Sequence, residues 1–137
     1  MKEVFADTLY WVAIVKPEDP YAKGAKQAEE DLGEFITVTT DEVLAEFLTS
    51  LSKGGAVLRK IAANMVHAIL DNPNVKVVPQ SRDSFLKGLE LYKNRTDKKY
   101  SLTDCVSMNV MKNKKISEAL THDHHFEQEG FKNLMKK

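Results

Sequence analysis

Four acidic side chains stand at positions where the sequence could assemble a shared site. Asp7 directly follows a short apolar run typical of a buried strand, and Asp123 stands just after another such run. Asp104 and Glu46 lie in the first and second turns of segments with helical spacing of apolar residues. Carboxylates gathered in one pocket repel one another and raise one another's pKa unless a cation is present. A shared pocket of these four acids would therefore favour a hard divalent cation such as Mg²⁺ or Mn²⁺.

The reaction that such a site would support is phosphodiester hydrolysis. Mg²⁺ keeps several of its waters and takes only one or two carboxylates directly, which leaves room for a substrate phosphate. One or two metal ions can activate a water and stabilise charge on the attacking and leaving oxygens. The four acids are therefore candidate residues for metal-assisted cleavage of a nucleic acid.

Each acid also has a purely structural interpretation. Asp7 could end a strand and cap the helix that follows. Ser101 and Asp104 have the spacing of a capping box, although a helical wheel places Asp104 on an apolar face, where an unpaired charge is costly. Glu46 could be a solvated helix charge, and Asp123 could belong to a turn. Spacing alone leaves both interpretations open.

The elements that must position these acids alternate between strands and helices. We predict strands at 3–6, 34–38, 75–79 and 116–120, with an edge strand at 131–134. We predict helices at 9–15, 21–32, from Thr39 or Thr40 to 51, at 56–70, 81–93 and 101–111, and a single turn at 124–128. With no hairpin signal, this order predicts one α/β domain spanning 1–137, with a mainly parallel sheet of about four to five strands and helices on both faces.

A parallel sheet explains how acids so distant in sequence could meet. All its strands end at the same carboxyl edge, and ligands bind in the crevice there. Asp7 and Asp123 would stand at that edge, and the helices that carry Glu46 and Asp104 would begin there. The predicted architecture therefore brings the four carboxylates together.

Two helical details can be checked directly against a structure. Thr39 and Glu42 have the spacing of a capping box, so capping rather than catalysis is the better role for Glu42. Apolar residues recur at helical spacing in 56–70 and 81–93, and we expect the stripe of the second helix to face inward. They are Leu58, Ile61, Ala62, Met65, Ile69 and Leu70 in the first helix, and Phe85, Leu86, Leu89 and Tyr92 in the second.

Composition narrows the class of protein further. The 20 basic and 20 acidic residues give a net charge of zero, so there is no overall basic field and any contact with nucleic acid must rest on a local patch. The single cysteine rules out an internal disulfide and fits a reducing compartment. No apolar run is long enough to span a membrane, and no signal-peptide pattern is present, so we expect a cytoplasmic location.

Other reactive residues point to weaker alternatives. His122, His124 and His125 cannot all converge easily on one ion, so exposed polar residues beside the acids are a better interpretation than a zinc site. Cys105 has no evident catalytic partner and is expected to be a buried packing residue. Asp97 could assist the site, although a loop charge is the better interpretation. An aspartate-nucleophile phosphatase would need a second aspartate where Leu9 stands.

Four motifs in this order resemble those of PIN-domain ribonucleases, and the chain is similar to VapC-type toxins of toxin–antitoxin pairs. The motifs are Val4–Thr8, Thr39–Phe47, Tyr100–Cys105 and Leu120–Phe126. The resemblance covers almost the whole chain, and the last two motifs are the more specific ones. It implies a PIN-like three-layer sandwich and Mg²⁺- or Mn²⁺-dependent endonucleolytic cleavage of RNA.

The resemblance also implies roles for particular residues. The acidic quartet of the family falls on Asp7, Glu46, Asp104 and Asp123. The three aspartates would be metal ligands, and Glu46 would bind metal or orient the attacking water. Hydroxyls that orient these acids would come from Thr8 and Thr121.

The implied partners are an RNA substrate and a cognate antitoxin. The predicted helices 56–70 and 81–93 carry enough apolar surface for an antitoxin or for a homodimer. Two alternatives remain open: a catalytically inactive PIN-like binding module, and an RNA-processing nuclease outside toxin–antitoxin systems. Candidate residues for the RNA path are Lys93, Arg95, Lys98, Lys99, Lys112, Lys114 and Lys115.

Overall fold

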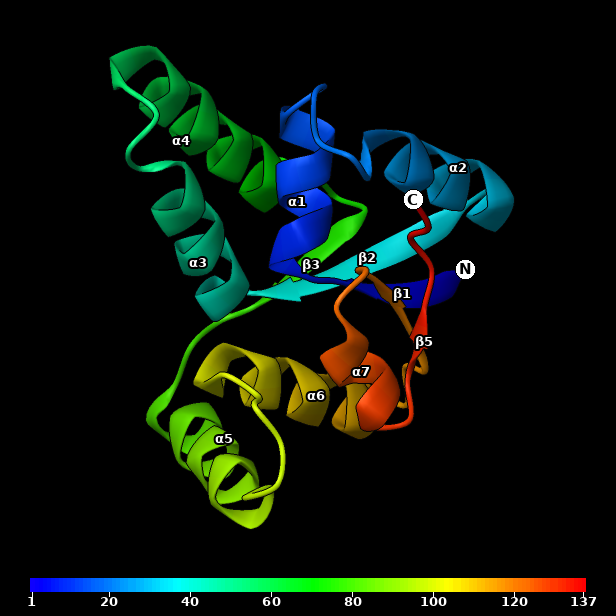
Figure 1. The fold of residues 1–137 in the computed structure, drawn as a ribbon, viewed down its shortest axis with the longest axis vertical. Helices are drawn as coiled ribbons and strands as arrows, with labels where there is room; N and C mark the ends of the chain where they lie inside the picture. Colours follow the sequence, from blue (N-terminus) through cyan, green and yellow to red (C-terminus); the bar gives the residue numbers. More distant parts are fainter.

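Five parallel strands form the central sheet of the computed structural model, which describes residues 1–137 (Figure 1). The strands are β1 (Lys2–Ala6), β2 (Phe35–Thr40), β3 (Val75–Val78), β4 (Glu118–Leu120) and β5 (Lys132–Asn133). Their order across the sheet is β3-β2-β1-β4-β5, and every neighbouring pair is parallel. The α/β class and the parallel sheet predicted from the sequence are confirmed.

Seven helices cover the two faces of the sheet and complete three layers (Figure 1). One face carries α1 (Thr8–Val15), α2 (Ala22–Leu32), α3 (Asp41–Leu51) and α4 (Ala56–Asp71). The other face carries α5 (Arg82–Asn94), α6 (Leu102–Lys114) and α7 (His124–Gln128). None of these helices combines the length and the hydropathy needed to cross a membrane.

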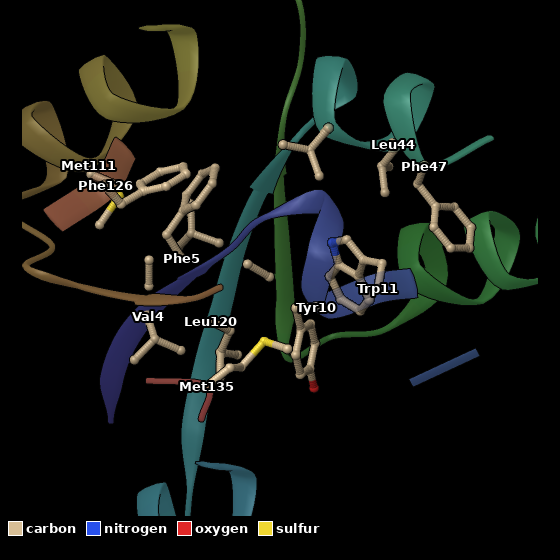
Figure 2. Packing of buried hydrophobic residues seen from close by; sticks show 14 of the residues in the cluster. Val4, Phe5, Tyr10, Trp11, Leu44, Phe47, Met111, Leu120, Phe126 and Met135 are labelled. Atoms are coloured by element: carbon tan, nitrogen blue, oxygen red, sulfur yellow. The ribbon is translucent and has the colours of Figure 1, made fainter. Parts of the chain in front are cut away.

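The hydrophobic core lies on both sides of β1 (Figure 2). Phe5 packs near Met111 and Phe126 on the side of α6 and α7, and all three are fully buried. Trp11 lies on the opposite side, is 4% exposed, and donates a hydrogen bond from Nε1 to Oγ1 of Thr39 at 3.4 Å. Burial on both faces anchors β1, whose last residue immediately precedes Asp7.

The predicted capping box at Thr39 and Glu42 is wrong. Thr39 is still part of β2, and its hydroxyl donates to the carbonyl oxygen of Ala6 at 2.9 Å, which ties β2 to the end of β1. Thr40 is the N-cap of α3, and its Oγ1 accepts the N–H of Val43 at 3.0 Å. Because β2 continues through Thr40, Glu42 falls one position short of the place that a capping box requires.

Helix α6 begins as predicted and ends later. The capping box of Ser101 and Asp104 is present in both directions. The helix continues past Met111 to Lys114, and Lys115 then adopts the left-handed conformation with φ 56°. The N–H of Ile116 bonds back to the carbonyl of Met111 at 2.8 Å, which satisfies a carbonyl of the last turn.

The sequence predicted that the apolar stripe of α5 faces the core, and this prediction is wrong. This helix packs on α6 through Gly88, where a Cβ would come within 2.7 Å of Val106 Cγ2. The stripe therefore stays in solvent, with exposures from 40% to 53%; it consists of Phe85, Leu86, Leu89 and Tyr92. The stripe of α4 is divided, since Ala62 and Ile69 are buried whereas Ile61 and Leu70 are about half exposed.

Candidate metal centre

Strand register places Asp7 beside Thr121 at the carboxyl edge of the sheet. Ala6 pairs with Leu120, so the residues that follow these two strands are neighbours. The backbone N–H of Asp7 donates to the carbonyl of Leu120 at 3.2 Å. The Thr121 hydroxyl donates to Asp7 Oδ2 at 2.8 Å. A backbone contact and a side-chain contact together fix the direction of the Asp7 carboxylate.

Glu46 reaches the same edge from the second turn of α3. Helices α1 and α3 pack against each other, and the Thr8 hydroxyl donates to Glu46 Oε1 at 2.6 Å. Thr8 directly follows Asp7 in the chain, so the end of β1 supplies one acid and orients a second. The Glu46 side chain is partly exposed, unlike that of Asp7.

Asp104 is both a capping residue and a member of the acidic group. Its Oδ2 accepts the backbone N–H of Ser101 at 3.0 Å, and the residue is 7% exposed. The same carboxylate lies close enough to Asp7 for its charge to raise the pKa of Asp7, and the charge of Asp123 in turn raises the pKa of Asp104. The capping role of Asp104 is therefore confirmed, and the same side chain lies among the other acids.

Asp123 caps the short helix α7 and is tied to the rest of the group through Thr121. Its Oδ1 accepts the N–H of His125 at 2.9 Å. Its own N–H donates to Thr121 Oγ1 at 3.1 Å, while that hydroxyl donates to Asp7. Thr121 therefore links two acids that lie more than a hundred residues apart in the chain.

Burial and mutual repulsion raise the pKa of two of these carboxyl groups. Desolvation is the largest cause at Asp7, which is 2% exposed, and it raises the pKa to about 7. The Thr121 hydrogen bond lowers that pKa, while the charges of Asp104 and Glu46 raise it again. At Asp104, burial is the largest cause of the raised pKa. The hydrogen bond from the Ser101 backbone lowers this pKa, and the charge of Asp123 raises it. The structure thus brings all four predicted acids into one group.

The donor set of this group fits a hard divalent cation. The four side chains offer only carboxylate oxygens, the ligands that Mg²⁺ and Mn²⁺ prefer. A cation would offset the desolvation cost of charging Asp7 and the repulsion among the acids. Asp7, Asp104, Asp123 and Glu46 are the residues that could hold it.

The three histidines near Asp123 have different surroundings, and the placement of one of them differs from the sequence prediction. His122 stacks flat on Tyr21, with ring centroids 3.5 Å apart. His124 is exposed, as predicted. His125 turns inward instead: its side chain is 18% exposed, and its Nδ1 lies 3.3 Å from Asp104 Oδ2. The ligand atoms of Asp123, His124 and His125 all lie within 4.8 Å of one another.

Glu129 is a central ion-pairing residue that sequence reasoning missed. Its carboxylate accepts two hydrogen bonds from Arg95, at 2.9 and 2.8 Å, one from the Tyr100 hydroxyl at 3.0 Å, and one from Lys112. These partners, the Arg95 guanidinium above all, lower the pKa of Glu129 to about 2. Arg95 and Lys112, expected on the RNA path, are therefore engaged with Glu129. Partners 17 to 34 residues away leave no local signal in the sequence.

The other reactive residues considered from the sequence play no part in the acidic group. Cys105 is fully buried, and burial raises the pKa of its thiol to about 11. Asp97 is an exposed loop charge that pairs with Lys98 at 3.0 Å. A pocket of about 600 Å³ lies at the start of the strands and is lined by residues that include Trp11, Phe35 and Val75.

Solved structures share the fold of this chain, and a family model matches its sequence. A search of curated protein sequences found no match. The solved structure of VapC20 from Mycobacterium tuberculosis, described as a toxin that cleaves the sarcin–ricin loop, is 26% identical with a TM-score of 0.84, covering 97% of this chain and 99% of VapC20. A chain of a toxin–antitoxin complex from Klebsiella pneumoniae, 15% identical with a TM-score of 0.61 over 88% and 87% of the two chains, shares the fold. The family model named PIN domain matches residues 4–132, and the chain belongs to this family.

Proposed function

We propose that this protein is a divalent-metal-dependent endoribonuclease and the toxin of a type II toxin–antitoxin pair. The observation that carries the proposal is the convergence of four carboxylates at the carboxyl edge of the sheet, with Asp7 buried among them. Membership of the PIN domain family and the likeness to a VapC toxin over nearly the whole chain support it.

Asp7, Asp104 and Asp123 would hold Mg²⁺ or Mn²⁺, with Glu46 at the side of the group. When bound, the metal supplies Lewis-acid activation of water and stabilises charge on the phosphate oxygens. The chain's own residues supply orientation. Thr121 fixes Asp7 and the backbone of Asp123, and Thr8 holds Glu46 at 2.6 Å, so that one carboxylate oxygen of Glu46 remains free to position a water.

The RNA would approach over lysines that have no strong partner of their own. Lys93 in the last turn of α5 and Lys99 in the loop before α6 are exposed, and so are Lys114 and Lys115, which stand at the other end of α6 from Asp104. Arg95 and Lys112 form ion pairs with Glu129 and are therefore less available to an RNA phosphate. Phosphate contacts of this kind give affinity without sequence preference.

A cognate antitoxin would bind the apolar stripe that α5 leaves in solvent. Exposed apolar side chains at helical spacing mark a surface for protein contacts, and none of the other elements covers Leu86, Leu89 or Tyr92. For the free protein, we propose a homodimer that forms through the same stripe.

We propose a cytoplasmic location, which suits activity on RNA and a single free cysteine.

Cleavage of RNA by the purified, antitoxin-free protein tests this proposal. A mixed RNA pool would be incubated in EDTA, in Mg²⁺ and in Mn²⁺, and the fragments would be sequenced to find their ends. We expect defined internal cuts in either metal and none in EDTA. Cutting that persists in EDTA would contradict the metal dependence. Binding of RNA without any cut in either metal would instead support the inactive binding module.

A further inference from the structure

His125 lies between two carboxylates of the acidic group. Its Nδ1 is 3.3 Å from Asp104 Oδ2 and also 3.3 Å from Asp123 Oδ1. Only 18% of the side chain is exposed, so the ring faces the acids rather than solvent. The two carboxylates come from different elements, the first turn of α6 and the N-cap of α7, and the imidazole nitrogen is equally near to both.

Nδ1 is within hydrogen-bonding distance of Asp104 Oδ2, but one hydrogen bond does not account for both contacts. When Nδ1 carries a hydrogen, that single N–H must be divided between the two carboxylates, and when Nδ1 has a lone pair it bonds to neither. Both distances exceed the usual N–H···O range of about 2.7–3.2 Å. Asp123 Oδ1 already accepts the backbone N–H of His125 at 2.9 Å. The nitrogen is therefore shared between two oxygens and well bonded to neither.

The distance of Nδ1 from each carboxylate oxygen does match the distance between two ligands of one ion. Two donor atoms that are each about 2.1 Å from a metal lie about 3.0–3.4 Å apart in tetrahedral or octahedral coordination. Both 3.3 Å contacts of Nδ1 fall within that interval. We propose that His125 is a nitrogen ligand of the divalent cation held by Asp104 and Asp123, and that it gives the site a preference for Mn²⁺ over Mg²⁺.

The preference follows from the donor type and rests on the proposed metal-dependent function. Carboxylates suit both ions, whereas Mg²⁺ takes oxygen ligands and Mn²⁺, as a first-row transition metal, accepts an imidazole nitrogen more readily than Mg²⁺ does. Neighbouring rings hold the imidazole in place. Tyr100 meets it edge to face at 5.4 Å, and His124 lies 4.6 Å away on a tilted plane. His124 itself is 71% exposed and 3.7 Å from Asp123, so His125 is the better-placed ligand.

The direct test is pulsed electron paramagnetic resonance of Mn²⁺ bound to the purified protein. Samples with ordinary and with ¹⁵N-labelled histidine would be compared for electron spin-echo modulation by a directly bound imidazole nitrogen. We expect nitrogen coupling that changes with the label in the unmodified protein. Mn²⁺ bound without nitrogen coupling would overturn the assignment, and this measurement needs no variant.

Variants then identify the histidine and the selectivity. His125→Asn should remove the coupling and weaken Mn²⁺ binding at least about tenfold, while Mg²⁺ affinity changes less than about threefold. The matched control is His67→Asn on α4, an exposed histidine far from the acids, which should change neither affinity. Circular dichroism would confirm folding, and His125→Gln serves as a second variant.

The remaining outcomes separate this proposal from the function on which it rests. Coupling that survives His125→Asn and disappears in His124→Asn would overturn the assignment to His125. Mn²⁺ binding that lacks nitrogen coupling but is abolished by Asp104→Asn would overturn it as well, while leaving the carboxylate metal site intact. Failure of the unmodified protein to bind Mn²⁺ at all would contradict both proposals.

Discussion

At the scale of single residues, Asp7 has the least favourable environment in the acidic group. Its carboxyl is almost completely buried, it faces Asp104 and Glu46, and only the Thr121 hydroxyl compensates among the side chains. A folded protein keeps such a group only at a cost in stability when it is charged. That cost is what metal binding would relieve.

Replacing Asp7 with asparagine should therefore stabilise the metal-free protein. Asn keeps an oxygen for the Thr121 hydroxyl and removes the charge. The raised pKa of Asp7 destabilises the fold above pH 4, and fully above pH 7, so at pH 8 in EDTA we expect a gain of about 1–3 kcal/mol in the free energy of unfolding. Urea denaturation measures it.

Mg²⁺ provides the control for this prediction. It should raise the stability of the unmodified protein and have little effect on Asp7→Asn. At pH 4, where the buried carboxyl is protonated in the fold, the difference between the two proteins should shrink. A variant that is less stable than the parent in EDTA at pH 8 would show that burial of Asp7 does not carry the assigned cost.

At the scale of elements, Glu129 joins three segments that the chain separates. It lies just after α7 and binds Arg95 and Tyr100 from the loop before α6, and Lys112 from the last turn of α6. The side chain of Glu129 is only 6% exposed. These contacts hold α7, with Asp123 at its start, against the helix that carries Asp104.

Glu129→Gln should lower stability at neutral pH and reduce the protein's sensitivity to acid. Because its pKa is lowered from 4.5 to about 2, the ionised carboxylate contributes stability above pH 4.5, and this contribution is lost as pH falls toward 2. Screening of the partly exposed Arg95 and Lys112 limits the loss at pH 7 to about 1–2 kcal/mol. Denaturation at pH 7 and pH 3 measures both effects, with exposed Glu127→Gln as the control. An equal loss at the two pH values would contradict this role.

The exposed stripe of α5 leads to a prediction about partners. Leu89→Glu places a charge at the centre of the stripe, where the side chain is 45% exposed. Folding stability should change by no more than about 0.5 kcal/mol, whereas affinity for the antitoxin should fall at least about tenfold. Titration calorimetry with the antitoxin and light scattering of the free protein measure these effects. The exposed Glu90→Gln on the same helix is the control, and unchanged association in Leu89→Glu would place the interface elsewhere.

At the scale of the whole molecule, the sequence predicted what depends on local pattern and on general rules of sheets. Alternating strands and helices indicated the parallel sheet, and the rule that strands share one carboxyl edge placed Asp7 and Asp123 together. Features that depend on contacts between distant parts of the chain were not predicted. The apolar stripe of α5 indicated a buried face, yet no other part of the chain covers it. The inward turn of His125 depends on the capping geometry of Asp123.

The measurement that tests the central claim most directly compares Asp104→Asn with Ser101→Ala in the RNA-cleavage assay with Mn²⁺. Both changes disturb the capping box of α6, but only the first removes a carboxylate from the acidic group. We predict that Asp104→Asn reduces cleavage at least about 100-fold, while Ser101→Ala costs about 1 kcal/mol of stability and still cuts RNA at the same positions. Cleavage that survives Asp104→Asn would show that the reaction takes place elsewhere on the molecule.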